Sequence, residues 1–275
     1  MSDPYLDPQS GILLNKLGLT DQVSLDRAEA DVVAVRSILL QGNPLKGNFD
    51  SQHLKQIHQY LFQDVYEWAG QFRKIGMVKA EFASGGRVTR FSSPELIEKE
   101  LTAVFEGLAR DHFLKGLLRR DFSRKVAVLF SEINRIHPFR EGNGRAQRQF
   151  VRQLSNSVGY KLHFEVVSKE RLVQASILSA NGDVSMMMRL MDEITDTERI
   201  QPLTKVIDHL KQHGFNWNDI YIATATPGEQ YTGIFAGTDG NNFFFRTEQA
   251  HILVGKLSDL RETPNAGEKI AFTAH

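Results

Sequence analysis

The spacing of apolar residues changes near residue 195, and this change limits the folds that the chain can adopt. Up to that point apolar residues recur every three or four positions, the spacing of helices with one buried face. Beyond about residue 215 they alternate with polar residues between glycine-rich turns, as in short strands. We therefore predict a mainly α domain over residues 1–195, a connecting segment and helix over 196–214, and a small all-β domain over 215–275.

Apolar spacing and end signals place the predicted elements. Asp121 is a candidate N-cap, Gly159 a candidate helix stop, and a connecting helix over 204–213 should end at Gly214. The helices predicted before residue 195 cover 24–40, 53–68, 94–110, 121–136, 145–158, 168–178 and 184–194. The five predicted strands cover 220–224, 230–236, 242–247, 251–257 and 269–274. Five short strands in succession favour a small barrel such as an OB-fold.

Chemically useful side chains are concentrated between two predicted helices, in the segment His137-Pro-Phe-Arg-Glu-Gly-Asn-Gly-Arg-Ala-Gln-Arg148. His137 is of a residue type whose ordinary pKa lies near neutrality, so it can accept a proton from an attacking hydroxyl. Glu141 offers a hard oxygen ligand of the kind that holds Mg²⁺ against nucleotide phosphates. Together with the glycine-flanked amide and the two arginines of the same segment, these residues predict an enzyme that handles a triphosphate.

The other residues of this segment suit the binding of an anion. Gly142 and Gly144 lack a Cβ, so the backbone can turn tightly there and bring N–H groups close to a phosphate. Asn143 offers an amide donor, and Arg145 and Arg148 would share one face of a helix that begins at about residue 144. Because a helix N-terminus attracts anions, we predict a phosphate cradle made of helix, loop and helix.

Each of these residues also has an ordinary structural interpretation. A His-Pro pair commonly ends a helix, two close glycines commonly form a surface turn, and lone arginines are commonly solvated. All of them in this fixed order within a dozen residues are far harder to explain by structure alone. The sequence therefore favours a functional interpretation of the whole segment.

The same segment resembles the Fic family signature H-P-F-x-[DE]-G-N-G-R-x-x-R, and every specified position is matched. The run from Ile57 to Arg73 is similar to the family's block H-x-x-L-F-x-D-V-Y-x-W-A-G-x-x-R, and the likeness extends over about residues 5–195. The resemblance implies a helical Fic domain that transfers AMP from ATP to a Tyr, Thr or Ser hydroxyl of a target protein, with release of pyrophosphate.

The resemblance also implies a role for each motif residue. His137 would deprotonate the target hydroxyl, and Glu141 would bind the Mg²⁺ that bridges the α- and β-phosphates of ATP. The phosphates would be held by the Gly142 and Gly144 amides at the α-phosphate, by Asn143 and Arg145, and by Arg148 at the γ-phosphate. The kinase-like branch of the family has Lys where this chain has Gly144, which favours AMP transfer over phosphorylation.

Members of the family have a β-hairpin flap that pairs with the backbone of the target, a form of β-augmentation. Residues 79–93 match it best, with Gly85-Gly86 as the hairpin turn, although without the family likeness an ordinary surface hairpin explains them as well. The flap is polar and basic, which favours an acidic surface on the target. The residues expected to position the target are Lys79, Phe82, Arg87 and Arg90.

Many family members also restrain themselves with an inhibitory helix that carries [ST]-x-x-x-E-[GN]. That string is absent from this sequence. The resemblance therefore implies inhibition in trans by a small antitoxin, whose Glu would meet Arg148. By the same likeness, Asn181-Gly182-Asp183 is expected at the lip of the adenine pocket.

The C-terminal segment resembles the domain that follows Fic in the Bartonella effector proteins (the Bep group). The likeness lies in two strings, Gly228-Glu-Gln-Tyr-Thr-Gly233 and Gly267-Glu-Lys-Ile-Ala-Phe-Thr-Ala274. The Bep group enters host cells by type IV secretion with a further C-terminal domain. This sequence does not contain that domain, so we expect a shortened form, and secretion stays open.

An OB-fold raises the hypothesis of nucleic-acid binding, with Phe243, Phe244 and Phe245 as stacking residues. Residues 200–275 contain six Lys or Arg against eight Asp or Glu, a net charge of −2 that makes no groove for phosphates. In a strand, at least one of three consecutive Phe must face the core. We therefore favour a structural or protein-docking role and expect no nucleic-acid partner.

Composition limits the remaining classes. Lys plus Arg and Asp plus Glu number 33 each, so no overall charge indicates nucleic acid or membrane as a partner. The chain has no cysteine, which excludes disulfides and Cys-ligated metals. No apolar run approaches the roughly 20 residues of a membrane span, and no signal-peptide core begins the chain. We expect synthesis and action in cytosol.

Two hypotheses from different classes remain open. The first is an AMP transferase whose target is a host small GTPase, as in the Bep group, or a bacterial topoisomerase subunit, as in the similar toxin branch. The second is a binding module with a degenerate nucleotide pocket and a docking barrel. The complete motif favours the transferase but does not separate its targets.

Overall fold

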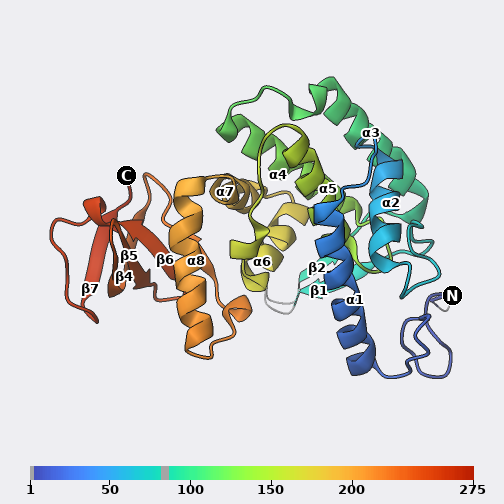
Figure 1. Ribbon diagram of the computed structural model, residues 1–275, viewed down its shortest axis with the longest axis horizontal. Helices are drawn as coiled ribbons and strands as arrows, with labels where there is room; N and C mark the ends of the chain where they lie inside the picture. Colours follow the sequence, from blue (N-terminus) through green and yellow to red (C-terminus); the bar gives the residue numbers. More distant parts are fainter. Residues whose placement is uncertain (1–2, 82–86) are drawn as a thin grey trace. The chain divides into compact units, whose positions relative to one another are not determined.

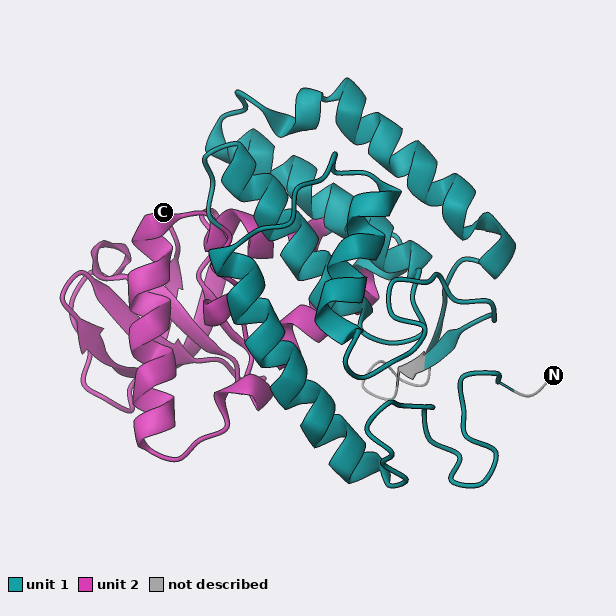
Figure 2. Cartoon of the chain, turned by 45° about the vertical axis from the view of Figure 1, so that its right-hand side comes forward, with its two compact units in different colours: residues 1–161, 179–184 teal, residues 162–178, 185–275 magenta. Residues whose placement is uncertain are grey.

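The computed structural model describes residues 3–81 and 87–275. The chain forms two compact units, shown in separate colours in Figure 2. Unit 1 comprises Met1–Lys161 and Ser179–Val184, and unit 2 comprises Leu162–Leu178 and Ser185–His275. Helices dominate unit 1 and a five-stranded sheet lies in unit 2, so the predicted fold class, a helical Fic domain with a hairpin and a C-terminal β domain, is confirmed.

Five α-helices build unit 1, and α5 packs against both α2 and α4 (Figure 1). Asp21 and Asp50 cap α1 and α2 by accepting hydrogen bonds from the backbone N–H groups of Ser24 and His53, each 2.8 Å long. Apolar side chains at helical spacing, such as Leu54, fill the core between the helices. The helices are α1 Gln22–Gly42, α2 Ser51–Phe62, α3 Ile97–Arg110, α4 Arg119–Ile136 and α5 Asn143–Ser157.

Two predicted helix ends in unit 1 are wrong. Helix α2 ends at Phe62 rather than at residue 68, because Tyr66 and Trp68 leave the helix and stack their rings 4.3 Å apart in the core. Helix α4 begins at Arg119, so Asp121 lies in the first turn, where its charge favours the helix without capping it. Gly159 follows the last residues of α5 with a φ of 89°, as predicted for a helix stop.

The predicted flap is an antiparallel hairpin of β1, Val78–Glu81, and β2, Arg87–Arg90. Lys79 pairs with Thr89, whose side chain is buried. The predicted turn at Gly85-Gly86 lies outside the described residues. The hairpin therefore presents exposed residues such as Lys79 and Arg90 above a buried anchor.

Unit 2 contains the five predicted strands, each within a few residues of its expected bounds. They form one sheet in the order β3-β6-β5-β4-β7, in which β3 and β6 are parallel and the other neighbours antiparallel. The strands are β3 Ile222–Thr224, β4 Gln230–Asp239, β5 Asn242–Arg246, β6 Ile252–Lys256 and β7 Lys269–Thr273. Assignment to an OB-fold stays a prediction.

The sheet buries Phe243 and Phe245 in its core, together with Phe235 and Phe272. Two of the three consecutive Phe proposed as stacking residues are therefore unavailable to a base, and Phe244 is half-buried. This arrangement follows from the alternation of side chains in a strand, which sends residues two apart to the same face.

The helices that group with the sheet are α6 Lys169–Ala180, α7 Ser185–Ile194 and α8 Thr197–Gln212. Asp196 caps α8, so this helix begins seven residues before the predicted one, and it accommodates Pro202 in its interior. No described helix is long and apolar enough to cross a membrane.

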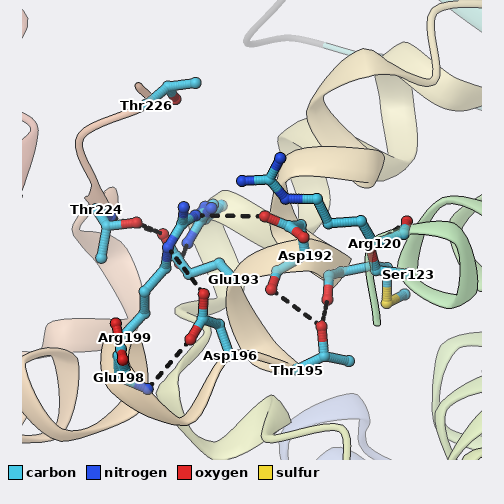
Figure 3. Close-up of polar contacts among 12 residues, drawn as sticks. Arg120, Ser123, Asp192, Glu193, Thr195, Asp196, Glu198, Arg199, Thr224 and Thr226 are labelled. Atoms are coloured by element: carbon cyan, nitrogen blue, oxygen red, sulfur yellow. Dashed lines mark hydrogen bonds and ion pairs between the residues drawn. The ribbon is translucent and has the colours of Figure 1, made fainter. Parts of the chain in front are cut away.

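A buried ion pair ties α6 and α7 to the sheet. Arg171 contacts Glu193, whose Oε2 accepts hydrogen bonds from the backbone N–H of Thr224 at 2.7 Å and from its hydroxyl at 2.5 Å (Figure 3). Both charged side chains are almost fully buried, which suits a structural pair. The compact units thus do not divide at residue 195, and the predicted domain limits stay predictions.

Candidate active site

The motif links α4 to α5 through a short loop within unit 1. His137 ends α4 with a left-handed φ of 51°, and its backbone N–H donates to the carbonyl of Ile133 at 3.0 Å. The chain then passes through residues 138–142 and enters α5 at Asn143. The predicted arrangement of helix, loop and helix is therefore present, with α5 starting two residues before its expected bound.

The imidazole of His137 is held against the base of the hairpin. It stacks on the ring of Phe91, which follows β2, with 3.9 Å between the ring centroids. The pKa of His137 is lowered to about 3, mainly by burial and also by the charges of Arg73 and Lys79, against the opposing effect of the Asn134 carbonyl. The ring is therefore neutral at physiological pH and able to accept a proton.

Arg73 orients the loop that carries His137, and we did not predict this role. Its guanidinium is buried and donates to the carbonyls of His137 at 2.8 Å, Ile136 at 3.2 Å, Ile75 at 2.6 Å and Ser92 at 2.5 Å. Its backbone N–H also donates to the carbonyl of Pro138. Its place at the end of the upstream block was the only signal in the sequence.

His58, a residue of α2, supports the loop, and this is a second role that we did not predict. Its Nδ1 accepts from the backbone N–H of Gly70, so Nε2 carries the proton and donates to the carbonyl of Glu141, both at 2.9 Å. The ring stacks on Phe139 with centroids 3.8 Å apart. Burial lowers the pKa of His58 to about 3, which fixes it as a neutral structural residue.

Asn143 occupies a different place from the one we predicted. We expected its side-chain amide to donate to a phosphate oxygen. Instead the amide accepts from the backbone N–H of Phe139 at 2.8 Å and donates to the carbonyl of the same residue at 2.7 Å. The side chain is buried, and in this structure it closes the loop onto the first turn of α5.

The two motif glycines serve the loop in different ways. Gly142 has a φ of 81°, and a Cβ there would lie 2.2 Å from Cζ of Phe62, so only glycine fits. Gly144 lies within α5, and a Cβ there would lie 3.4 Å from Nη1 of Arg148. Gly142 therefore makes the turn, while Gly144 leaves space in front of an arginine.

Arg145 and Glu141 form one charged group at the start of α5. Nη2 of Arg145 lies 3.2 Å from Oε1 of Glu141 and 2.5 Å from Oε1 of Glu29, a residue of α1. The guanidinium carbon lies 4.7 Å from the centroid of the Phe62 ring. We did not predict Glu29, because nothing in the sequence near it signals a contact with α5.

Arg148 is a half-buried cation with no ion-pair partner in residues 3–81 and 87–275. Its pKa is lowered to about 10, mainly by burial and also by the positive charges of Arg145 and Arg152. The side chain nevertheless stays charged at neutral pH. A half-buried positive charge that faces further positive charges is an unfavourable arrangement that an anion would relieve.

The predicted flap residues are only partly covered by the structure. Lys79 and Arg90 are exposed on β1 and β2, and the charge of Lys79 acts on the pKa of His137. Arg87 begins β2, and Phe82 lies outside the described residues. Asn181, predicted at the lip of the adenine pocket, lies against the hairpin with its Nδ2 3.5 Å from the hydroxyl of Thr89.

The donor set is compatible with Mg²⁺ held mainly by nucleotide phosphates. Glu141 is half-exposed, and its Oε1 is engaged by the N–H of Gly142 and by Arg145, whereas its Oε2 has no partner among residues 3–81 and 87–275. Within the described part of the chain, no three His, Asp, Glu or Cys side chains cluster as a metal cage would require. One carboxylate plus substrate phosphates is a usual way for proteins to bind this ion.

Comparison with known proteins finds relatives for the helical part and for the whole chain. Residues 48–155 match the model of the Fic/DOC family. The chain is 34% identical to a protein adenylyltransferase of Bartonella henselae, over 98% of this chain and 52% of that protein. It is also 34% identical to the probable protein adenylyltransferase Fic of Escherichia coli, over 70% of this chain and 92% of that protein.

Solved structures agree with these matches. The type IV secretion system effector protein BepA has a TM-score of 0.86 and 31% identity, covering 98% of this chain and 95% of that one. BepC of Bartonella tribocorum with bound AMPPNP has a TM-score of 0.63 and 29% identity, covering 70% of this chain and 96% of that one. The chain spans about half the length of the curated Bartonella relatives that it matches, 52% and 44%.

Proposed function

The chain belongs to the Fic/DOC family, and we propose that it transfers AMP from ATP to a hydroxyl group of a target protein. Relatives that cover most of this chain are named protein adenylyltransferases, which supports the reaction class. The related BepC binds AMPPNP, which supports ATP as the donor.

In the proposed step, the oxygen of the target hydroxyl forms a bond to the α-phosphorus of ATP while the bond to pyrophosphate breaks. The proton of the hydroxyl goes to the imidazole of His137, which is neutral at physiological pH and so has a nitrogen lone pair to accept it. Arg145 and Arg148 would hold the phosphates and so fix the α-phosphorus in line for attack. Mg²⁺ beside Glu141 would neutralise phosphate charge.

One observation carries the proposal, namely the unpaired charge of Arg148. It lies one turn into α5, whose first N–H groups have no acceptor within the helix. An anion would stabilise both these backbone N–H groups and the Arg148 cation. The neutral His137 lies at the other end of the same short loop. An uncompensated cation and a proton acceptor within one short motif are more readily explained by a reaction site than by a structural role.

Radiolabel transfer tests the proposal. Wild type, His137→Ala and the control His275→Ala, which changes an exposed histidine at the C-terminus, are incubated with α-³²P-ATP, Mg²⁺ and lysates of host cells or bacteria. We expect a labelled protein band with wild type and the control, and a loss of about a hundredfold or more in His137→Ala. Label of equal strength in all three proteins would overturn the proposal.

The target is proposed at a finer level from the family resemblance. The type IV secretion system effector BepA matches nearly the whole chain, which supports delivery by type IV secretion, and a host small GTPase is the target that we propose with it. The second candidate is an antitoxin-controlled toxin that modifies a bacterial topoisomerase subunit, and the likeness to the probable protein adenylyltransferase Fic of Escherichia coli supports only the shared reaction class. Label in the host lysate alone favours the first, and label in the bacterial lysate alone favours the second.

Two partners are part of the proposal. A target strand would pair with the hairpin, and a small inhibitory protein would place a Glu carboxylate on Arg148, whose lack of a partner among the described residues supports this site. The rival function, a binding module without transfer, gains from the finding that Asn143 is engaged within the loop. Nucleotide binding without His137-dependent label in either lysate would favour that rival.

A further inference from the structure

We propose that Glu29 is a positioning residue for Arg145, which it holds in the orientation that receives the nucleotide phosphates. This inference rests on the proposed function, because it assigns a task to a residue outside the motif in the same reaction. Glu29 lies on α1, more than a hundred positions before Arg145, and no motif contains it.

One terminal nitrogen of the Arg145 guanidinium, Nη2, is held by its contacts. Nη2 of Arg145 lies 2.5 Å from Oε1 of Glu29, whereas its distance to Oε1 of Glu141 is 3.2 Å. The ring of Phe62 supports the plane of the guanidinium at 4.7 Å. No hydrogen bond from Nε or Nη1 occurs within the part of the chain that the structure describes, so this edge remains for a ligand.

Glu29 is itself held in place. The hydroxyl of Tyr66 donates a hydrogen bond to Oε2 of Glu29, and both side chains are buried. Burial raises the pKa of Tyr66, and the charges of Glu29 and Glu141 raise it further, so the hydroxyl keeps its proton and remains a donor. Tyr66 stacks in turn on Trp68, which anchors the carboxylate to the core.

This arrangement matters because Glu141 has a competing task. Its Oε1 contacts Arg145 in the present structure, yet the same carboxylate is the proposed ligand of Mg²⁺. When a cation takes Glu141, the longer contact to Arg145 weakens and the shorter one to Glu29 remains. Glu29 therefore keeps Arg145 oriented in both states, which lowers the ordering cost of nucleotide binding.

A merely structural pair between α1 and α5 makes a different prediction. In that case removal of the charge would lower stability and leave the affinity of the folded protein for nucleotide unchanged. The positioning role instead predicts that the affinity for nucleotide falls while the stability changes little. Measurement of both quantities in the same variants separates the two.

The test compares Glu29→Gln and Tyr66→Phe with Asp31→Asn, a matched change of an exposed carboxylate on the same helix. Calorimetry measures the affinity for AMPPNP with Mg²⁺, thermal unfolding measures stability, and label transfer gives KM for ATP and kcat. We expect Glu29→Gln to weaken AMPPNP binding and raise KM by about tenfold, Tyr66→Phe to have a smaller effect, and Asp31→Asn none.

Unchanged AMPPNP affinity in Glu29→Gln, or a loss matched by Asp31→Asn, would overturn the positioning role. Tighter binding in Glu29→Gln would overturn it as well and would identify Glu29 as a competitor of the phosphates. Because AMPPNP binding needs no transfer, Glu29 can be tested even when no target is labelled. If wild type labels no protein but Glu29→Gln still weakens AMPPNP binding, the proposed transfer is rejected and the positioning role is retained.

Discussion

Arg73 donates a hydrogen bond from Nε to the backbone carbonyl of His137 at 2.8 Å, across 64 positions of sequence. The same guanidinium holds the carbonyl of Ser92, which lies just beyond the hairpin. The proposed base and the proposed target-binding strands are therefore fastened to one buried side chain. Its position at the end of the upstream block acquires a physical explanation from these contacts.

Replacement of Arg73 should damage both stability and transfer. Arg73→Met keeps much of the volume but leaves four carbonyls, one of them buried and three part-buried, without their donor, so we expect a loss of about 3 kcal/mol in the free energy of unfolding. Urea unfolding measures the loss. The stability of Arg73→Lys, which keeps the charge but has fewer donors, should lie between those of wild type and Arg73→Met. Equal stability of the three proteins would contradict the role of these hydrogen bonds.

Replacement of Arg148 should change stability and nucleotide binding in opposite directions. Arg148→Gln removes a half-buried cation that faces Arg145 and Arg152, so the empty protein should gain about 1 kcal/mol. The affinity for AMPPNP should fall by about tenfold or more, because a charge-assisted contact is lost. Thermal unfolding with and without AMPPNP measures both effects. A lower stability of the empty variant than of wild type would show that the Arg148 charge is not unfavourable in the empty site.

The two motif glycines should respond differently to alanine. Gly142→Ala places a Cβ 2.2 Å from Cζ of Phe62 at a φ of 81°, so we expect a loss of at least about 2 kcal/mol in stability. Gly144→Ala meets only Nη1 of Arg148 at 3.4 Å within a helix, so the variant should fold as wild type. Urea midpoints of the two variants test this difference, and similar losses would contradict it.

Acid should destabilise the protein through two histidines whose pKa values are lowered, the buried His58 and the half-buried His137. His58 and His137 have pKa values of about 3 in the folded chain against an ordinary 6.5, so their contribution is fully present above pH 6.5. As pH falls from 6.5 toward 3, the unfolded chain binds protons that the folded chain excludes. The stability lost is about 1.4 kcal/mol per histidine and pH unit.

The variant His58→Gln tests that assignment. Between pH 7.0 and 5.5, its free energy of unfolding should fall by about 1 kcal/mol less than that of wild type, whatever its absolute stability. Urea unfolding at the two pH values gives the comparison. The matched control is His275→Ala, whose exposed histidine should leave the pH dependence unchanged. An equal loss in His58→Gln and wild type would show that His58 titrates normally in the folded chain.

Local pattern predicted the elements well, because helix and strand periods are properties of short windows of sequence. The strands from Ile222 to Thr273 and the helices around the motif follow from spacing alone. The end of α2 was missed because the stack of Tyr66 on Trp68 is a tertiary contact that competes with helix propensity.

The candidate site was predictable to the extent that chemistry resides in the motif. The turn at Gly142 and a charged arginine at position 148 were expected from residue type, but the lack of an ion-pair partner for Arg148 among the described residues was not. The inward amide of Asn143 was not, because its partner is a backbone group four positions away whose direction only the folded loop defines. Glu29 was out of reach for a related reason, since no local pattern pairs it with Arg145.

The fastening of the hairpin and the His137 loop to Arg73 has a consequence for selectivity. If a target strand pairs with the hairpin as proposed, we expect it to act on the guanidinium that holds the His137 loop, so a poorly fitting strand would disturb both. Discrimination between substrates would then appear in turnover more than in affinity. Many proteins would then bind the hairpin, and few of them would bind in a way that leaves His137 aligned to accept the proton.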